Sequence, residues 1–207
     1  MQASKRNRTA VGGATAEPVT LTEVKSQLRI SISVSDEDTL LNSYIIAATD
    51  YTENICARSL IEGTCDLYMD RFPASDYHQL KIPLPPLISV TSIKYFDQSD
   101  VEQTWDSAEY VVDTDQDNKG LIYPGRNYSW PAARDFFKSV HVEYQAGYAD
   151  SAASPVDEAD NVPQEFKQAI LLLIGHMYEN REASSAGVEI KTVPMGYMAL
   201  LENYRVR

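Results

Sequence analysis

The sequence predicts an α+β fold: a three-helix layer (two N-terminal helices plus a C-terminal helix) with an inserted antiparallel β-sandwich or small barrel and extended N- and C-terminal tails. Apolar side chains recur at helical spacing over residues 20–58 and again over residues 163–182. Between these stretches, short alternating or β-branched runs are separated by turn-forming residues, a pattern typical of antiparallel strands. The helical layer is therefore split in sequence and rejoined in space.

The N-terminal part predicts an arm followed by a helical hairpin. Residues 1–18 hold small residues and three basic side chains without an apolar run, so we expect a flexible arm and no signal peptide. In residues 19–62, Thr20 and Glu23 have the spacing of a capping box and predict the first helix. The acidic run at 35–38 predicts the start of the second helix, because acids in a first turn interact favourably with the helix dipole.

The middle of the chain, residues 63–149, predicts the β insertion. From Thr64 the hydrophobic period changes to two, as in a half-buried strand. Residues 97–103 are expected to form an acidic turn and residues 113–120 a loop. The expected strands cover residues 64–70, 78–82, 88–96, 110–112, 121–123 and 140–144.

After a loop over residues 150–162, the helix predicted at 163–182 is apolar on more than one side. A helix of this kind must be buried on several sides. Its charged residues cut the apolar run far below the roughly 20 residues that a membrane span requires, so we expect no membrane association. The two N-terminal helices would cover one side. A neighbouring subunit would cover the side formed by Leu171, Leu172, Ile174 and Tyr178.

The C-terminal tail, residues 183–207, ends in a short amphipathic pattern. Met195, Met198, Leu201 and Tyr204 recur at three-residue steps and predict a short turn of helix. Such a short helix is not stable alone, so we expect it to dock on another surface.

The charge distribution excludes a protein that wraps nucleic acid. The chain carries a net charge of −12, while residues 1–19 hold three basic and one acidic side chain. Neutralising phosphates requires clustered Lys and Arg, which the acidic body lacks. With 43% hydrophobic and 23% charged residues, we expect a soluble cytoplasmic globular protein. Its acidic body either serves solubility alone or binds the basic ends of neighbouring subunits or partners.

No pattern predicts catalysis, a cofactor or a metal site. His78, His141 and His176 have no partner at ligand spacing, and no nucleophile or phosphate-binding motif occurs. Cys56 and Cys65 are expected to be small buried hydrophobes. In the loop 113–120, alternating aspartates resemble a calcium loop, but the Gly and Glu that such a loop needs are misplaced.

One aromatic group leaves two roles open. Its members could stack on bases or sugars, but beside two prolines they are better explained as packing at the sandwich edge or at a subunit interface. The group consists of Tyr123, Tyr128, Trp130, Phe136 and Phe137.

Segments spread over most of the chain carry a resemblance to a known family. They are PVTLTEVK at 18–25, IIAATDY at 45–51, DRFP at 70–73, IPLPPLISVTSI at 82–93, VEYQAGY at 142–148, the predicted helix at 163–182, which ends in HMYENRE, and LLENYRV at 200–206. In this order they resemble the head–tail connector, or adaptor, proteins of tailed bacteriophages, most closely at 163–182. Residues 1–16 are not covered by the resemblance.

The resemblance implies a structural protein of the virion neck, assembled in the host cytoplasm. Such proteins form a ring, usually of twelve copies, below the portal protein. The ring extends the channel through which genomic DNA passes without sequence-specific binding, and it docks a stopper or tail-completion protein. The tail would contact the portal, with candidate contacts at Val193, Met195, Tyr197, Met198, Leu201, Tyr204, Arg205 and Arg207.

Three alternatives stay open at this point. The chain could be another neck component, such as a stopper or tail-completion protein. It could be a binding module that recognises a carbohydrate or peptide through Trp105 or Trp130. An enzyme is the third alternative, and no motif favours it.

Overall fold

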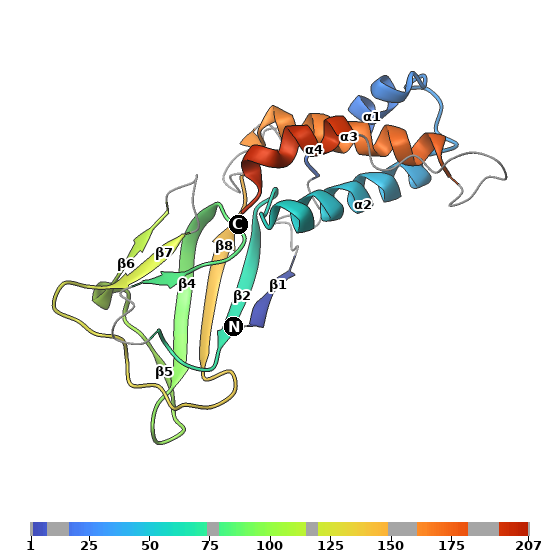
Figure 1. The fold of residues 1–207 in the computed structure, drawn as a ribbon. Helices are drawn as coiled ribbons and strands as arrows, with labels where there is room; N and C mark the ends of the chain where they lie inside the picture. Colours follow the sequence, from blue (N-terminus) through green and yellow to red (C-terminus); the bar gives the residue numbers. More distant parts are fainter. Residues whose placement is uncertain are drawn as a thin grey trace. The chain divides into compact units, whose positions relative to one another are not determined.

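The chain folds into two compact units in the computed structural model, which describes residues 2–7, 17–73, 79–114, 120–148, 161–181 and 195–206 (Figure 1). The β unit is formed by residues 1–15 and 62–148, and the helical unit by residues 16–61 and 149–207. Most of the β unit thus lies in sequence between the two parts of the helical unit.

Among its described residues the helical unit contains four helices, whereas the sequence predicts the three helices of the layer and a short helical turn in the tail. They are α1 (Leu21–Leu28), α2 (Asp38–Cys56), α3 (Gln164–Glu179) and α4 (Met195–Leu201), which continues into a 3₁₀ turn, η3 (Glu202–Tyr204). The helix α3 packs against α1, α2 and α4. Residues 195–204 are helical, as their three-residue apolar spacing predicts, so only the description of this part of the tail as extended is wrong.

The sequence predicts the start of α1 correctly and the start of α2 only approximately. The capping box of α1 is confirmed: Thr20 N–H donates to Glu23 Oε2 (2.6 Å), and Glu23 N–H donates to Thr20 Oγ1 (3.2 Å). The second helix begins at Asp38, after a turn in which Asp38 N–H donates to the carbonyl of Ser35 (3.1 Å). Of the three acids expected in its first turn, only Asp38 lies there.

A buried lysine ties α1 to the start of α2. Lys25 Nζ lies 2.6 Å from Asp38 Oδ1 and donates to the carbonyl of Val34 (2.7 Å). Its side chain is only 5% exposed. A buried ammonium is tolerated when it is paired and hydrogen-bonded, so this contact fixes the connection between the two helices.

The β unit contains two antiparallel sheets. The five-stranded sheet has the order β1 (Gln2–Asn7), β2 (Gly63–Met69), β8 (Val140–Ala146), β4 (Leu87–Phe96) and β5 (Glu102–Thr104). The three-stranded sheet has the order β3 (Leu80–Lys81), β7 (Leu121–Pro124) and β6 (Tyr110–Asp113). Neither sheet closes on itself among the described strands, so the small-barrel alternative is wrong, while the mixture of helices and antiparallel sheets is confirmed.

One hydrophobic core serves both sheets. In β2 and β8 every second residue is buried, as the alternation predicts. Strands of both sheets contribute to the same buried cluster, which includes Leu67, Ile93, Val142, Leu80 and Ile122. The sandwich arrangement itself stays a prediction.

Two strands do not appear in the sequence prediction. The strand β1 pairs with β2 where a flexible arm was expected, and β5 pairs with β4 in a segment expected to be a turn. Both lie at the edges of the five-stranded sheet. Edge strands are often short and polar, so a hydrophobic alternation does not reveal them in the sequence.

Candidate assembly surfaces

The last helix, α4, is anchored in the helical unit by a buried tyrosine. The hydroxyl group of Tyr197 lies 3.0 Å from Thr52 Oγ1, and its ring stacks on Tyr51 at 6.0 Å between centroids. Tyr197 and Leu201 are fully buried. Burial raises the pKa of Tyr197 to about 12. These two side chains, predicted as portal contacts, hold α4 in place in this conformation.

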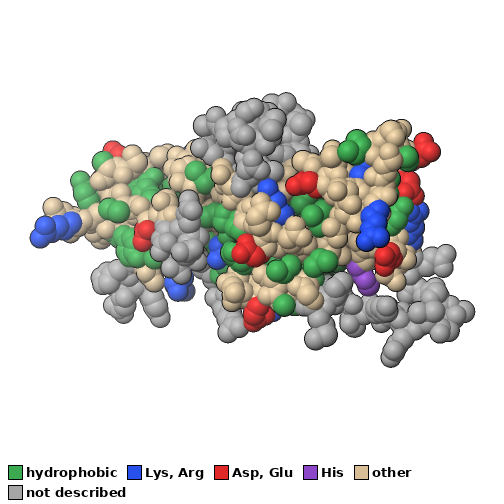
Figure 2. All heavy atoms as spheres, turned by 90° about the horizontal axis from the view of Figure 1, so that it is seen from above, with side chains coloured by type: hydrophobic (Ala, Val, Ile, Leu, Met, Phe, Trp, Pro, Cys, Tyr) green, Lys and Arg blue, Asp and Glu red, His purple; other side chains and the backbone are tan. Residues whose placement is uncertain are grey.

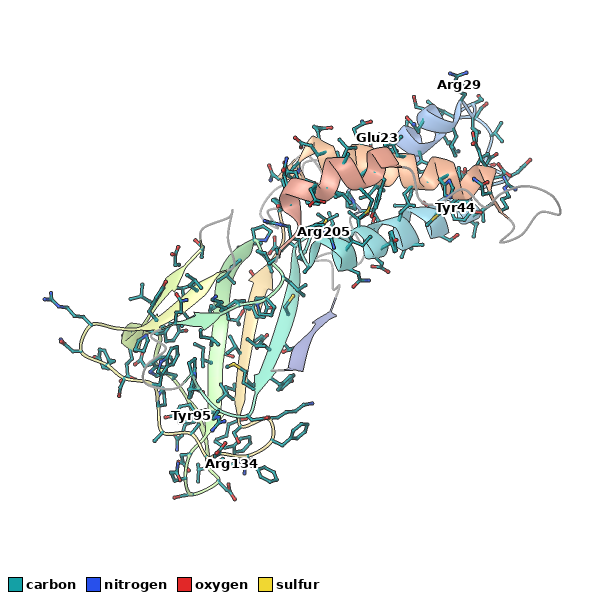
Figure 3. All side chains as sticks on the ribbon, viewed as in Figure 1. Glu23, Arg29, Tyr44, Tyr95, Arg134 and Arg205 are labelled. Carbon is teal, nitrogen blue, oxygen red and sulfur yellow. The ribbon has the colours of Figure 1, made fainter. Side chains whose placement is uncertain are left out.

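The segment after α4 is held by hydrogen bonds to residues at the end of α2 and just beyond it. Val206 N–H donates to the carbonyl of Cys56 (3.0 Å), and Arg58 Nε donates to the carbonyl of Tyr204 (2.7 Å). The ring of Tyr204 packs on Phe166. Figure 3 shows Arg205 beside the C-terminal end of α2.

The remaining predicted portal contacts differ in accessibility. Arg205 is exposed, and Met198 and Tyr204 are half-buried. Met195 is the first residue of α4. Val193 and Arg207 lie outside the described residues. The accessible part of the tail that the structure describes is therefore centred on Met198 and Arg205.

The side chains predicted at a subunit interface are mostly covered by the same chain. Leu171 and Ile174 are buried, with exposures of 7% and 0%, whereas Leu172 is 36% exposed. A Cβ atom placed on Gly196 of α4 would lie 3.9 Å from Leu172, so the tail helix runs close to this face. Docking of α4 thus accounts for much of the excess apolar surface of α3.

The fourth predicted interface residue, Tyr178, belongs to a polar cluster between α3 and the start of α2. Its hydroxyl group donates to Glu37 Oε2 (2.6 Å), and Arg181 Nη2 lies 2.7 Å from Glu37 Oε1. The guanidinium group of Arg181 lies 4.4 Å from the centre of the Tyr178 ring. The hydrogen bond from Tyr178, followed by that from Arg181, lowers the pKa of Glu37 below its ordinary value of 4.5.

A loop of the β unit presents two exposed aromatic rings, which we call the aromatic knob (Phe136 and Phe137). Phe136 is 65% exposed and Phe137 is 59% exposed. The cationic groups of Arg134 and Lys138 lie over these rings, at 5.4 Å and 5.3 Å from the ring centres. Figure 3 shows Arg134 near Tyr95 at one end of the β unit.

The knob has an ordered support. Arg134 forms an ion pair with Asp100 (2.6 Å), and its backbone N–H donates to the carbonyl of Phe96 (2.9 Å). Lys138 N–H donates to Asp70 Oδ1 (3.0 Å), and Ser139 Oγ donates to the carbonyl of Phe136 (2.8 Å). Bonds on both sides of Phe136 and Phe137 therefore hold the knob in position.

The same loop lines an open pocket of about 560 Å³, which we call the aromatic pocket. Trp130 supports it from inside, because its ring packs on Phe72 (5.5 Å) and Trp105 (5.4 Å). Tyr128 is 51% exposed. The lining residues are Pro73, Tyr123, Pro124, Gly125, Arg126, Tyr128, Ser129 and Trp130. The predicted aromatic group is thus divided between the pocket and the knob.

His141, Cys56 and Cys65 are packed or hydrogen-bonded within the fold. His141 Nε2 lies 2.7 Å from Asp66 Oδ1, and its ring stacks on Tyr68 at 4.5 Å. Cys56 and Cys65 are buried free thiols, and burial raises the pKa of Cys56 to about 11. The described ranges contain no group of three His, Cys, Asp or Glu residues suited to a metal ion. His78 and most of the acidic loop lie outside them.

The surface lacks a dominant basic region on the face shown in Figure 2. There, acidic and basic side chains of the described residues are interspersed with apolar ones. No helix among these residues is long and apolar enough to cross a bilayer.

Exposed apolar side chains such as Leu172, Phe136 and Phe137 are compatible with contacts to other proteins. The chain belongs to the family of phage gp6-like head-tail connector proteins, which it matches over residues 18–121 and 131–205. Its role as a structural head–tail connector follows from this membership.

Solved structures support the assignment. A chain from the neck of an empty gene transfer agent (GTA) particle, computed with C6 symmetry, is 26% identical, with a TM-score of 0.74 over 100% of this chain and 97% of that chain. A chain from the virion of a native GTA particle is 23% identical, with a TM-score of 0.75 over 99% of this chain and 96% of that chain.

A third similar chain comes from the neck of a native GTA particle computed with C12 symmetry. It is 23% identical, with a TM-score of 0.68 over 98% of this chain and 96% of that chain. No curated protein sequence matches the chain.

Proposed function

We propose that this protein forms a homo-oligomeric ring of twelve copies in the virion neck, directly below the portal protein. The ring extends the channel for genomic DNA and docks the next neck or tail protein, a stopper or tail-completion protein. Family membership carries the proposal, and the 26%-identical neck chain, from a particle computed with cyclic symmetry, supports it. Assembly takes place in the host cytoplasm, and the role is structural, not catalytic.

The portal contact is proposed for the tail surface that stays accessible when α4 is docked. Arg205 offers a cation beside the half-buried thioether of Met198. Tyr197 and Leu201 would act indirectly, by holding α4 in position, because both are buried. Val193, Met195, Tyr204 and Arg207 complete the proposed portal-facing segment.

Between neighbouring subunits, Leu172 is the apolar residue of α3 left available. It is 36% exposed, whereas Leu171 and Ile174 are covered by the same chain. Tyr178 can contribute its ring edge, since its hydroxyl group is already bonded to Glu37. The channel surface is proposed to be acidic or neutral, so that DNA passes without adhering to it. A channel lined with Lys and Arg would refute this point.

One alternative is another position in the neck, as a stopper or tail-completion protein. A carbohydrate- or peptide-binding module is less well supported: Trp105 is 3% exposed, and the ring of Trp130 is engaged with Phe72 and Trp105. Stacking on a ligand requires an accessible aromatic face.

A native mass measurement separates these functions. The chain is measured alone and after mixing with the portal protein of its particle. A connector gives a portal complex that carries a full ring of added copies. A chain that stays monomeric in the mixture overturns the proposal. Met198→Ala with Arg205→Ala tests the tail, because these side chains contribute little to the fold; unchanged portal attachment would contradict the tail assignment.

A further inference from the structure

We propose that neighbouring subunits of the ring are joined by the aromatic knob of one copy, which inserts into the aromatic pocket of the next. The inference rests on the ring proposed above and adds the contact that joins its members. It assigns a role to two features of the β unit that no folding requirement explains: an outward-facing pair of phenylalanines and an open aromatic pocket.

The knob has the properties of an anchor for another protein surface. Adjacent phenylalanines that are 65% and 59% exposed leave apolar surface in contact with water, which association would remove. The hydrogen bonds of Arg134, Lys138 and Ser139 hold the knob loop in one conformation. A pre-ordered loop loses little conformational entropy on binding, so more of the burial energy contributes to affinity.

The pocket has the complementary properties. Its volume of about 560 Å³ is large enough to receive a phenyl ring, since pockets of roughly 300–1,000 Å³ hold whole small-molecule ligands. Tyr123 and Tyr128 supply aromatic surface, and Pro73 and Pro124 supply rigid apolar surface. Arg126 is exposed among the lining residues, where its guanidinium group can stack on an entering phenyl ring.

Ring symmetry favours a second copy of this chain as the occupant of the aromatic pocket. In a cyclic ring each subunit contacts its two neighbours through two different patches, which must complement each other. Knob and pocket form such a pair, one protruding and one hollow. Both belong to the β unit, so their complementarity does not depend on how the two units are arranged. The family match leaves out residues 122–130, which supply most of the pocket lining, so it assigns no role to this segment.

The test uses two variants with opposite defects. The knob variant carries Phe136→Ser and Phe137→Ser; the pocket variant carries Tyr128→Glu. Both sites are exposed, so the urea midpoint of each variant should equal that of the wild type. The matched control is Val101→Ser, a 52% exposed apolar residue of the same unit, outside both surfaces. Each protein is mixed with the portal, and ring assembly is measured by native mass and by titration.

Each variant should weaken every subunit contact by at least about 30-fold, the loss that a central interface residue causes, and should form no ring. The control should assemble like the wild type. An equimolar mixture of knob and pocket variants retains one intact contact per pair. It should therefore give heterodimers but no rings, which a general loss of solubility would not produce.

The outcomes separate this contact from the proposed function. Wild-type rings together with fully assembled rings of both variants would overturn the knob-and-pocket contact and leave the connector function standing. Variants that form rings but fail to bind the next neck protein would also overturn it, because the knob would then face that protein. Absence of wild-type rings in the portal mixture would overturn the proposed function and, with it, the contact.

Discussion

Replacing Tyr197 tests whether α4 is an integral part of the helical unit. Tyr197 is fully buried, and truncation of a buried aromatic side chain to alanine costs about 3–5 kcal/mol of unfolding free energy. Tyr197→Phe keeps the ring and removes only its hydroxyl group. Thr52 also donates to the carbonyl of Ala48 (2.7 Å), so its own hydroxyl hydrogen keeps a partner. The Phe variant should therefore lose only about 0.5–1.5 kcal/mol.

The assay is equilibrium urea unfolding, combined with hydrogen exchange of the α4 amides. A helix of seven residues is not stable without its packing surface. Tyr197→Ala should therefore release α4, and its amides should exchange much faster than those of α2 and α3. The matched control is Ala199→Ser, an exposed position on the same helix, with an expected change within about 0.5 kcal/mol. If Tyr197→Ala behaved like this control, the anchoring role of α4 would be refuted.

Three further predictions concern the helical unit. Lys25→Met should destabilise the protein by about 1.5–3 kcal/mol in urea unfolding, because Asp38 and the loop carbonyls lose a charged partner; an unchanged midpoint would contradict the structural role of this buried ammonium. The lowered pKa of Glu37 means that its contacts stabilise the fold above pH 4.5 and that this contribution is lost as the pH falls below 4.5; Glu37→Gln should remove that part of the pH dependence of stability. Burial raises the pKa of Cys56 to about 11, so its thiol should react with a disulfide reagent at pH 8 only after denaturant is added, and rapid reaction of the native protein would count against this burial.

Local signals predicted much of the fold because they depend on neighbours in sequence. The capping box at Thr20 and the alternation in β2 and β8 specify their elements through contacts made within a few residues. The edge strand β1 carries no apolar pattern, since its pairing with β2 uses main-chain groups. The acidic run at 35–38 predicts the start of α2 too early, because acidic residues favour the turn before a helix as well as its first turn.

The exposure of the candidate surface residues could not be predicted from the sequence, because it depends on packing between residues far apart in the chain. The apolar excess of α3 indicates that several sides are buried, but not which element covers each side. In the structure, Leu171 and Ile174 are buried within the same chain, whereas Leu172, which lies close to α4, remains exposed. Likewise, residues 123–137 showed a group of aromatic residues, while the division into a supported Trp130 and an exposed Phe136 depends on partners such as Phe72 and Trp105.

Electron cryomicroscopy of the neck reconstituted from the portal protein and this chain tests the central claim most directly. The account predicts a closed ring of this chain on the portal, with an open channel along its axis and the helical tail facing the portal. A single bound copy, or density for this chain only outside a ring, would contradict the assignment as the head–tail connector.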